Sequence, residues 1–228
     1  MRRFLAALLI VAALLPAAAQ AGLYDSTMIL VNKQNALPKS YEPDDLSYVD
    51  IAYAEGVPAT RKQLREEAAR ALERLYAAML EEGIEIVGVS GYRSYSTQSL
   101  IYNQRLEETS LDYVSRYVAK PGQSEHQTGL AMDVAIPDWP FLTTDFALTD
   151  AYAWLTAHAH EYGFIIRYPE TGEEETGYAF EPWHIRYVGD TAAELRESGM
   201  TLEAWYRRRL GGSHARREAR FLLPTGSK

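Results

Sequence analysis

The sequence contains no cysteine among its 228 residues. This absence excludes a disulfide framework, a thiolate zinc site and a cysteine nucleophile. Any metal ion must therefore be held by His, Asp or Glu side chains. An excess of positive charge is also missing, because 31 acidic residues outnumber 23 Lys and Arg and give a formal net charge of -8. That balance argues against a nucleic-acid-binding protein.

A hydrophobic run long enough to span a bilayer is absent from the N-terminal region. Residues 4–15 are apolar, whereas a spanning helix needs about 20 such residues. Arg2 and Arg3 precede this run, and Ala19-Gln20-Ala21 follows it as a small-residue cleavage site. The pattern predicts a secretory signal peptide, residues 1–21, cleaved after Ala21, and hence an exported protein of the cell envelope or the medium. An uncleaved N-terminal anchor is the alternative.

The remaining length fits one domain, which we place at residues 22–210 with its motifs between 84 and 189. The chain ends in a basic tail, residues 211–228. From Arg207 onward, six Arg and one Lys face one Glu, whereas residues 22–206 carry a net charge of -16. Such a tail could contact anionic wall polymer or lipid headgroups, or it could be a solvated end. We expect a monomer.

The order of the expected elements indicates an α+β fold. Apolar residues between Leu64 and Met79 recur at helical spacing, which predicts a helix that starts at Thr60 with Gln63 in a capping box. Further helices are expected from Ser94 or Ser96 to Tyr117, and from Asp150, Thr191 and Thr201. Short apolar segments predict strands at residues 28–31, 84–90, 130–136, 164–167 and within 178–188. Regular βαβ alternation is lacking, so we expect a mainly antiparallel central sheet flanked by helices.

The first chemical motif is Ser124-Glu125-His126-Gln127-Thr128-Gly129-Leu130-Ala131-Met132-Asp133. A turn at Thr128-Gly129 can fold the chain so that a His on a loop and an Asp on a strand converge. Asp133 then points to the same side of the strand as Ala131. The small residues there leave space for a metal ion and a substrate chain.

The second motif, Glu181-Pro182-Trp183-His184, follows about fifty residues later. Glu181 can lie beside a zinc-activated water molecule without binding the metal, as the general-base Glu of H-E-x-x-H proteases does. Trp183 is large enough to pack beneath the site. Taken alone, either motif is equally consistent with a structural His and an ordinary acidic residue.

Taken together, the motifs supply two imidazoles and one carboxylate as ligands, and a second carboxylate as a base. A catalytic zinc site needs this set, with three protein ligands and an open position for water. The remaining histidines, His158, His160 and His214, fit helix-end or tail positions better than a metal site.

The chain resembles the VanY-type D-alanyl-D-alanine carboxypeptidases over about residues 28 to 190. The resemblance lies in Val31-Asn32-Lys33 with Leu37-Pro38, Tyr92-Arg93-Ser94, Ser124-x-His126-x-x-Gly129-x-Ala131-x-Asp133, Tyr162-Gly163-Phe164 with Arg167-Tyr168-Pro169, and Glu181-Pro182-Trp183-His184-x-Arg186-Tyr187-Val188-Gly189. It implies the α+β zinc D,D-peptidase fold, which is hedgehog-like. It also implies that His126, Asp133 and His184 bind Zn²⁺ and that Glu181 is the general base.

The resemblance further implies that Arg93 and Ser124 help to hold the substrate, and Gln98 is a further candidate for that task. A carboxypeptidase must recognise a free C-terminal carboxylate, and an Arg side chain can bind a carboxylate through two parallel hydrogen bonds. Arg93 could equally polarise the scissile carbonyl and stabilise its oxyanion.

These observations predict an exported zinc carboxypeptidase that removes the terminal D-Ala from peptidoglycan stem peptides. An L,D-carboxypeptidase acting on tetrapeptide stems is the nearest alternative. A non-catalytic wall-binding module that contains zinc is a second alternative, although such a module has no need for Glu181 as a base. An extracellular metal-scavenging protein is a third, and it would not need Arg93.

Overall fold

The computed structural model describes residues 26–211. The expected signal peptide and the basic tail from residue 212 lie outside these residues, so the structure does not test them. Within the described part of the chain, no helix is both long and apolar enough to cross a membrane.

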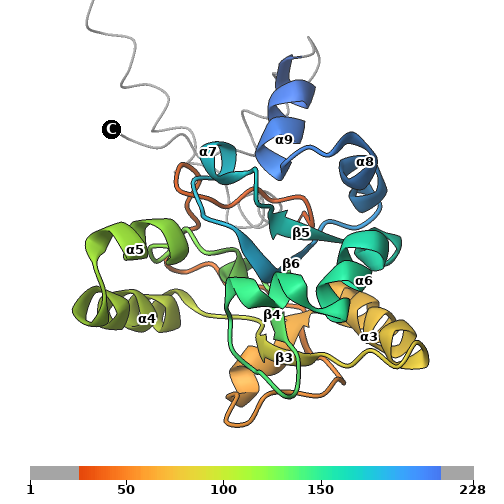
Figure 1. The fold of residues 1–228 in the computed structure, drawn as a ribbon. Helices are drawn as coiled ribbons and strands as arrows, with labels where there is room; N and C mark the ends of the chain where they lie inside the picture. Colours follow the sequence, from red (N-terminus) through yellow and green to blue (C-terminus); the bar gives the residue numbers. More distant parts are fainter. Residues whose placement is uncertain (1–25, 212–228) are drawn as a thin grey trace, which may run out of the picture.

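The centre of the fold is a four-stranded antiparallel sheet, with a separate two-stranded ribbon beside it (Figure 1). The sheet has the order β3-β4-β6-β5, and every neighbouring pair is antiparallel. Its strands are β3 (Val87–Ser90), β4 (Ala131–Ala135), β6 (Glu181–Tyr187) and β5 (Phe164–Tyr168), and the ribbon pairs β1 (Leu46–Tyr48) with β2 (Gln63–Arg65). The expected α+β class with an antiparallel central sheet is confirmed.

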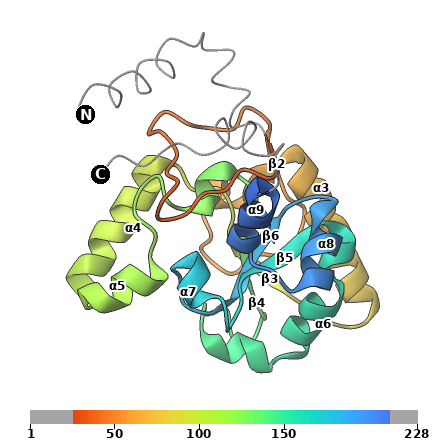
Figure 2. The ribbon, with the colours of Figure 1, turned by 90° about the horizontal axis from the view of Figure 1, so that it is seen from above.

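Helices lie on both sides of this sheet. They are α3 (Glu66–Glu81), α4 (Tyr95–Glu108), α5 (Leu111–Tyr117), α6 (Asp150–His158), α7 (Glu173–Thr176), α8 (Thr191–Ser198) and α9 (Leu202–Gly211). In both views α4 and α5 form an arm on one side of the sheet, whereas α3, α6 and α8 lie on the other (Figures 1 and 2). Short 3₁₀-helices fill several connections: η1 (Ala59–Lys62), η2 (Glu125–Thr128), η3 (Thr144–Leu148) and η4 (Ala159–Tyr162).

The alternation of side chains along the strands gives the sheet two different faces. One face joins the main apolar core, to which β4 contributes Met132 and Val134 and β6 contributes Ile185. Helix α3 packs its buried Leu72, Leu75 and other apolar residues into the same core. The opposite face therefore receives the residues between them, and these include Asp133, His184 and Arg186.

A second, smaller apolar core anchors the end of the described chain. It joins residues of α8 and α9 to the N-terminal segment and to the end of β6: Leu30, Val188, Ala192, Leu195, Leu202, Trp205 and Tyr206. Through this cluster, α9 is fixed beside the polar face of the sheet.

Two expected elements differ from the structure near the N-terminal end. Residues 28–31 form no strand, although Ile29, Leu30 and Val31 are buried. The backbone carbonyls of Thr27 and Ile29 accept hydrogen bonds from the Arg186 side chain instead of from a neighbouring strand. The first long helix begins at Glu66 rather than at Thr60. Gln63–Arg65 is extended instead, since it pairs with β1.

The helix expected to reach Tyr117 is divided into α4 and α5. Ser94 caps the start of α4 by accepting a hydrogen bond from the backbone amide of Thr97. The chain becomes extended at Thr109, and the Ser110 hydroxyl accepts a hydrogen bond from the amide of Tyr113 to cap α5. Side-chain capping by serine thus starts a new helix within the expected one.

Candidate metal centre

His126 is held by the connection between β3 and α4. Its Nδ1 lies 2.8 Å from the carbonyl oxygen of Gly91. A carbonyl can only accept, so Nδ1 carries the hydrogen and the lone pair is left on Nε2. The close approach requires glycine at position 91, because an added Cβ there would lie 2.5 Å from the carbonyl oxygen of Gln63. His126 is thereby oriented with Nε2 toward the strand that carries Asp133.

Gly129 ends the 3₁₀-helix that carries His126, two residues before β4 begins. Its φ of 68° lies in the left-handed region that favours glycine. An added Cβ would also lie 2.9 Å from a methyl group of Leu46. This turn folds His126 back over the strand, as the sequence predicts.

Asp133 and His184 are direct partners across β4 and β6. Asp133 Oδ1 lies 2.9 Å from His184 Nδ1, and Asp133 Oδ2 lies 3.1 Å from His126 Nε2. All three residues are buried, and one ligand atom from each can be chosen so that all lie within 4.8 Å of one another. His126 Nε2 is buried without a hydrogen-bond partner among the described residues. The structure therefore brings together the three expected metal ligands.

Glu181 is the first residue of β6 and pairs with Tyr168. Residues three apart in a regular strand face opposite sides of a sheet. The register between β5 and β6 shifts in this segment, and Glu181 Oε2 comes within 3.9 Å of His184 Nδ1. Such irregularities commonly re-aim side chains next to active sites. Glu181 therefore lies beside the three candidate ligands, where the sequence reasoning placed it.

Arg93 lies beside this cluster. Its backbone amide donates to the carbonyl of His126 at 3.1 Å, and its guanidinium lies 3.5 Å from Asp133 Oδ2. Burial lowers the pKa of Arg93, while the carboxylates of Asp133 and Glu181 act in the opposite direction. The side chain is mostly buried, and its Nε has no partner within residues 26–209.

These residues line one cleft of about 190 Å³ at the surface of the sheet. Ser124 and Gln98, the other expected substrate contacts, also line it. Gln98 donates through Nε2 to the carbonyl of Ala119 at 2.7 Å. The lining is completed by residues of the α4–α5 arm and the segment after it, by aromatic residues around the sheet, and by one acidic and one aliphatic residue: Ile101, Arg105, Tyr113, Tyr117, Val118, Ala119, Tyr168, Tyr178, Trp183, Glu125 and Leu142. The cleft thus opens between the sheet and this arm.

Burial and neighbouring charges shift the pKa values of three groups in the cluster. Burial raises the pKa of Glu181 to about 8, and the nearby carboxylates of Asp133 and Glu125 act in the same direction. Burial alone would lower the pKa of His184, but the neighbouring carboxylates of Asp133 and Glu125 raise it to about 9. Burial and the charge of Arg93 lower the pKa of His126 to about 4. Perturbed pKa values of this kind are typical of functional sites.

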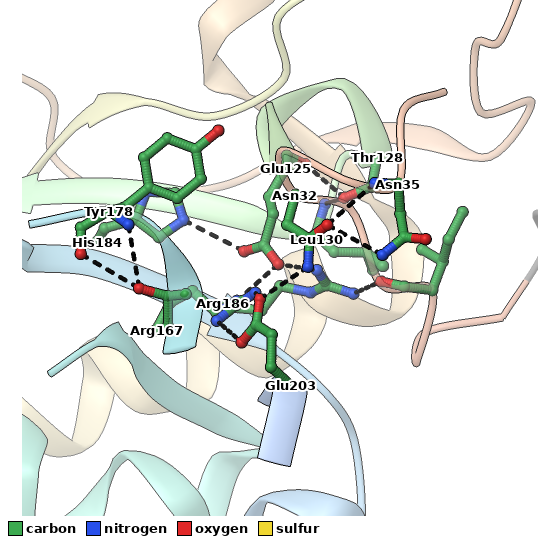
Figure 3. Close-up of polar contacts among 12 residues, drawn as sticks. Asn32, Asn35, Glu125, Thr128, Leu130, Arg167, Tyr178, His184, Arg186 and Glu203 are labelled. Carbon is green, nitrogen blue, oxygen red and sulfur yellow. Dashed lines mark hydrogen bonds and ion pairs between the residues drawn. The ribbon is translucent and has the colours of Figure 1, made fainter. Parts of the chain in front are cut away.

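A buried charge network, missed by the sequence reasoning, lies behind the cluster (Figure 3). Glu125 Oε1 accepts hydrogen bonds from Arg167 Nε at 2.7 Å and from an Arg186 terminal nitrogen at 2.6 Å. Its other oxygen faces His184 Nε2 at 3.4 Å. Burial would raise the pKa of Glu125, but the two guanidinium groups outweigh it and hold the pKa below its usual range.

The network continues into the last helix. Arg167 forms two parallel hydrogen bonds to Glu203 of α9, at 2.7 and 2.9 Å, and Asn32 donates to Glu203 at 3.0 Å. The sequence signals for this network were an arginine in each of two apolar strands, β5 and β6, and an acidic residue next to His126. None of these signals identifies a partner.

The other histidines stay outside the cluster, as expected for the part of the chain that the structure describes. His158 is exposed and lies 2.9 Å from Glu161. Trp183 belongs to the main apolar core as well as lining the cleft, which agrees with the prediction that it packs beneath the site.

Comparison of the sequence with known proteins finds a carboxypeptidase family and relatives named as carboxypeptidases. Residues 61–190 match the VanY family, described as D-alanyl-D-alanine carboxypeptidase. The putative carboxypeptidase YodJ of Bacillus subtilis (strain 168) is 42% identical over 184 residues, which cover 80% of this chain and 67% of YodJ. The bifunctional D-Ala-D-Ala dipeptidase and D-Ala-D-Ala carboxypeptidase VanXYC of Enterococcus gallinarum is 38% identical over 72% of this chain and 84% of VanXYC.

Solved structures of carboxypeptidases and D,D-peptidases share the fold of this chain. The LD-carboxypeptidase LdcB superposes with a TM-score of 0.73 at 42% identity, over 78% of this chain and 84% of LdcB. A mutant of the vancomycin-resistance D,D-pentapeptidase VanY, in complex with Zn(II), superposes with a TM-score of 0.65 at 31% identity, over 78% of this chain and 98% of VanY. On the sequence match and on the shared fold, this chain belongs to the VanY family of D-alanyl-D-alanine carboxypeptidases.

Proposed function

We propose that the protein is a zinc-dependent carboxypeptidase that removes the terminal D-Ala from peptidoglycan stem peptides. The observation that carries this proposal is the convergence of His126, Asp133 and His184 in one cleft, with Glu181 beside them. Family membership supplies the reaction class, because VanXYC and VanY are named for D-Ala-D-Ala and D,D-peptidase activities.

The donor set fits zinc. Two imidazoles and one carboxylate are ligands that Zn²⁺ accepts, and a catalytic site keeps its fourth position open. His126 Nε2 is a buried nitrogen without a hydrogen-bond partner among the described residues, and it lies beside Asp133. A metal ion would satisfy this nitrogen. When bound, zinc acts as a Lewis acid that polarises the scissile carbonyl and acidifies water.

Glu181 would serve as the general base. Its carboxylate takes a proton from the attacking water and passes it to the amine that leaves with D-Ala. The raised pKa of Glu181, about 8, makes it a stronger base than an exposed glutamate. A positive charge bound next to it would lower this pKa toward the working pH. A carboxylate in this position argues against the non-catalytic wall-binding module.

Arg93 would bind the C-terminal carboxylate of the substrate or stabilise the developing oxyanion. It lies at the cleft with an unpartnered Nε in the described part of the chain. Ser124 and Gln98 line the same cleft and would supply further hydrogen bonds to the peptide. A metal-scavenging protein has no use for this arrangement.

An L,D-carboxypeptidase acting on tetrapeptide stems is the second candidate. The observation in its favour is similarity, because the LD-carboxypeptidase LdcB is 42% identical to this chain whereas VanY is 31% identical. The two activities differ in the residue before the scissile bond, so the metal cluster alone does not distinguish them.

Defined muropeptides provide the test. The purified protein is incubated with pentapeptide and tetrapeptide stems, and the products are identified by mass spectrometry. Loss of one D-Ala from the pentapeptide supports the proposal, and a chelator should abolish it. Cleavage of the tetrapeptide alone would replace the D,D assignment by the L,D one. Absence of cleavage on both substrates, with zinc bound, would contradict the carboxypeptidase function.

The protein would act outside the cytoplasm. The N-terminal pattern predicts cleavage after Ala21, and peptidoglycan, the proposed substrate, lies there. Contact of the basic tail with wall polymer or lipid, and a monomeric state, stay predictions. Mass determination of the protein secreted by its host and sedimentation analysis would test the processing site and the state of association.

A further inference from the structure

The Glu125 network combines full burial with a direct approach to the metal cluster. The side chains of Glu125, Arg167 and Arg186 are completely inaccessible to solvent. Burying so many charges is costly unless each finds a partner. The arrangement of the contacts shows what these charges can do.

The two carboxylate oxygens of Glu125 have different surroundings. Oε1 is saturated by hydrogen bonds from Arg167 and Arg186. Oε2 has no hydrogen-bond partner in the described residues and faces His184 Nε2 at 3.4 Å, which is likewise unpartnered there. This separation is slightly longer than that of a typical N–H···O hydrogen bond, and no other group of the described residues competes for either atom. Glu125 can therefore accept the Nε2 hydrogen of His184.

This contact decides which nitrogen of His184 faces the metal. With the hydrogen on Nε2, the lone pair is on Nδ1, and Nδ1 lies 2.9 Å from Asp133 Oδ1. His126 is oriented in the opposite sense, because its Nδ1 is bound to the carbonyl of Gly91. A metal-binding histidine commonly donates its second N–H to a carboxylate or a carbonyl, which fixes the ring and its tautomer.

Glu125 is itself held in place by Arg167 and Arg186, which bind the oxygen that does not face His184. Arg167 connects it to Glu203 of α9 through two hydrogen bonds. Arg186 connects it to the N-terminal segment through the carbonyls of Thr27 and Ile29. Segments from both ends of the described chain therefore converge on one carboxylate oxygen (Figure 3).

We propose that Glu125 is a positioning residue for the metal centre: its carboxylate, fixed by Arg167 and Arg186, holds the His184 imidazole with Nδ1 toward the metal. This inference rests on the proposed zinc site.

The variant that tests this is Glu125→Gln. The amide keeps the size of the side chain but has one acceptor oxygen, so a donor must face either the guanidinium groups or His184 Nε2. Loss of such a partner typically costs 10–100-fold in metal affinity. Glu203→Gln is the matched control, because it removes a charge from the same network without touching His184.

Zinc dissociation constants are measured by competition with a chelator for the wild type and both variants. Glu125→Gln should weaken zinc binding about 10–100-fold, and Glu203→Gln should weaken it far less. Equal affinities of the two variants would overturn the inference, because a purely structural network would affect both alike. A wild-type chain that binds no zinc would overturn the proposed function together with this inference.

The wild type gives a second test that does not depend on the variants folding. In the zinc-loaded protein, nitrogen-15 NMR of the imidazoles should show His184 protonated at Nε2 and His126 protonated at Nδ1, with slow exchange of both hydrogens. In Glu125→Gln, exchange at His184 should accelerate while His126 stays unchanged as an internal reference. A zinc-loaded His184 protonated at Nδ1 would overturn the inference.

Discussion

Asp133 and His184 stand directly opposite each other on β4 and β6, and their side chains meet with Oδ1 2.9 Å from Nδ1. Opposed residues of an antiparallel pair have Cβ atoms about 4.5–5.5 Å apart, which suits two ligands of one metal ion. The pairing register of two central strands thus sets the geometry of the site. Only His126 is brought in from a connection, by the turn at Gly129.

Zinc affinity should rise with pH between about 6 and 9. The pKa of His184 is raised to about 9, so in protein stripped of metal this residue is protonated at neutral pH. Zinc binding must displace that proton, and affinity therefore gains about tenfold per pH unit for each proton released. His126, with a pKa near 4, is already neutral and adds no proton in this range. Chelator competition at several pH values measures the slope.

Glu181 provides the control for this titration. Its pKa of about 8 means that it also releases a proton when a dication binds beside it. Glu181→Gln should therefore have a shallower dependence of zinc affinity on pH than the wild type. Affinities that are equal at pH 6 and pH 8 in the wild type would contradict the assignment of His184 as a ligand.

The same substitution tests the general base. Glu181→Gln keeps the size and the hydrogen-bonding capacity of the side chain but removes the proton acceptor. It should retain one zinc per chain, because it lies outside the three ligands, and lose about 10²–10⁴-fold in kcat. Metal content and kcat are measured on the same preparation. A variant with full zinc and a kcat near that of the wild type would place the base elsewhere.

The cluster of proposed metal ligands could be predicted from the sequence because the chemistry of these residues agrees with their expected positions. His126, Asp133 and His184 occur in short motifs, and strand alternation by itself puts Asp133 on the face away from Met132 and Val134. The position of Glu181 depends on the register shift between β5 and β6, and no local sequence pattern predicts such a shift. The role of Glu181 as general base was therefore expected from the family motif rather than from residue spacing.

The charge network could not be predicted, because its partners are distant in the chain. Asn32 and Glu203 are 171 positions apart and Glu125 and Arg186 are 61 apart. A lone Arg in a strand or a Glu in a short helix indicates a solvated residue by composition alone. Only the tertiary fold shows that Arg167 and Arg186 point to the polar face of the sheet.

Local patterns also failed where tertiary pairing was stronger. The capping-box pattern at Thr60 and Gln63 favours a helix, yet pairing with β1 keeps Gln63–Arg65 extended. The apolar residues 28–31 resemble a strand, but the Thr27 and Ile29 carbonyls bind Arg186 instead of a neighbouring strand. Both errors arise at segments whose hydrogen-bond partners lie elsewhere in the chain.

Removing Glu203 should destabilise the fold strongly. Glu203→Ala leaves Arg167 buried with half of its partners, and breaking a buried pair typically costs about 3–5 kcal/mol. Glu194→Ala is the matched control, because Glu194 pairs with Arg209 at 3.3 Å on the exposed surface, where such pairs contribute about 0–1 kcal/mol. Urea unfolding of metal-free protein measures both. Similar midpoints for the two variants would contradict a stabilising role for the network.

Arg93 should determine whether the enzyme requires a free C-terminus. Its guanidinium lies at the cleft beside Asp133 and Glu181, and it can form two hydrogen bonds with a carboxylate. Free-acid and amidated stem peptides are compared on the wild type, Arg93→Ala and Arg93→Lys. The wild type should favour the free acid by about 1.5–3 kcal/mol in transition-state stabilisation, the value typical of a hydrogen bond to a charged group. Arg93→Ala should lose most of this preference.

The lysine variant separates charge from geometry at this position. Lysine keeps the positive charge but cannot reproduce the planar pair of donors, so Arg93→Lys should recover only part of the preference. Zinc content serves as the control, since Arg93 is not expected to be a ligand and all three proteins should bind one ion per chain. If Arg93→Lys recovers the full preference for the free acid, Arg93 acts only through its positive charge and not through its planar pair of donors. If the wild type cleaves both peptides equally, the enzyme does not recognise a C-terminus, and an endopeptidase assignment would replace the carboxypeptidase.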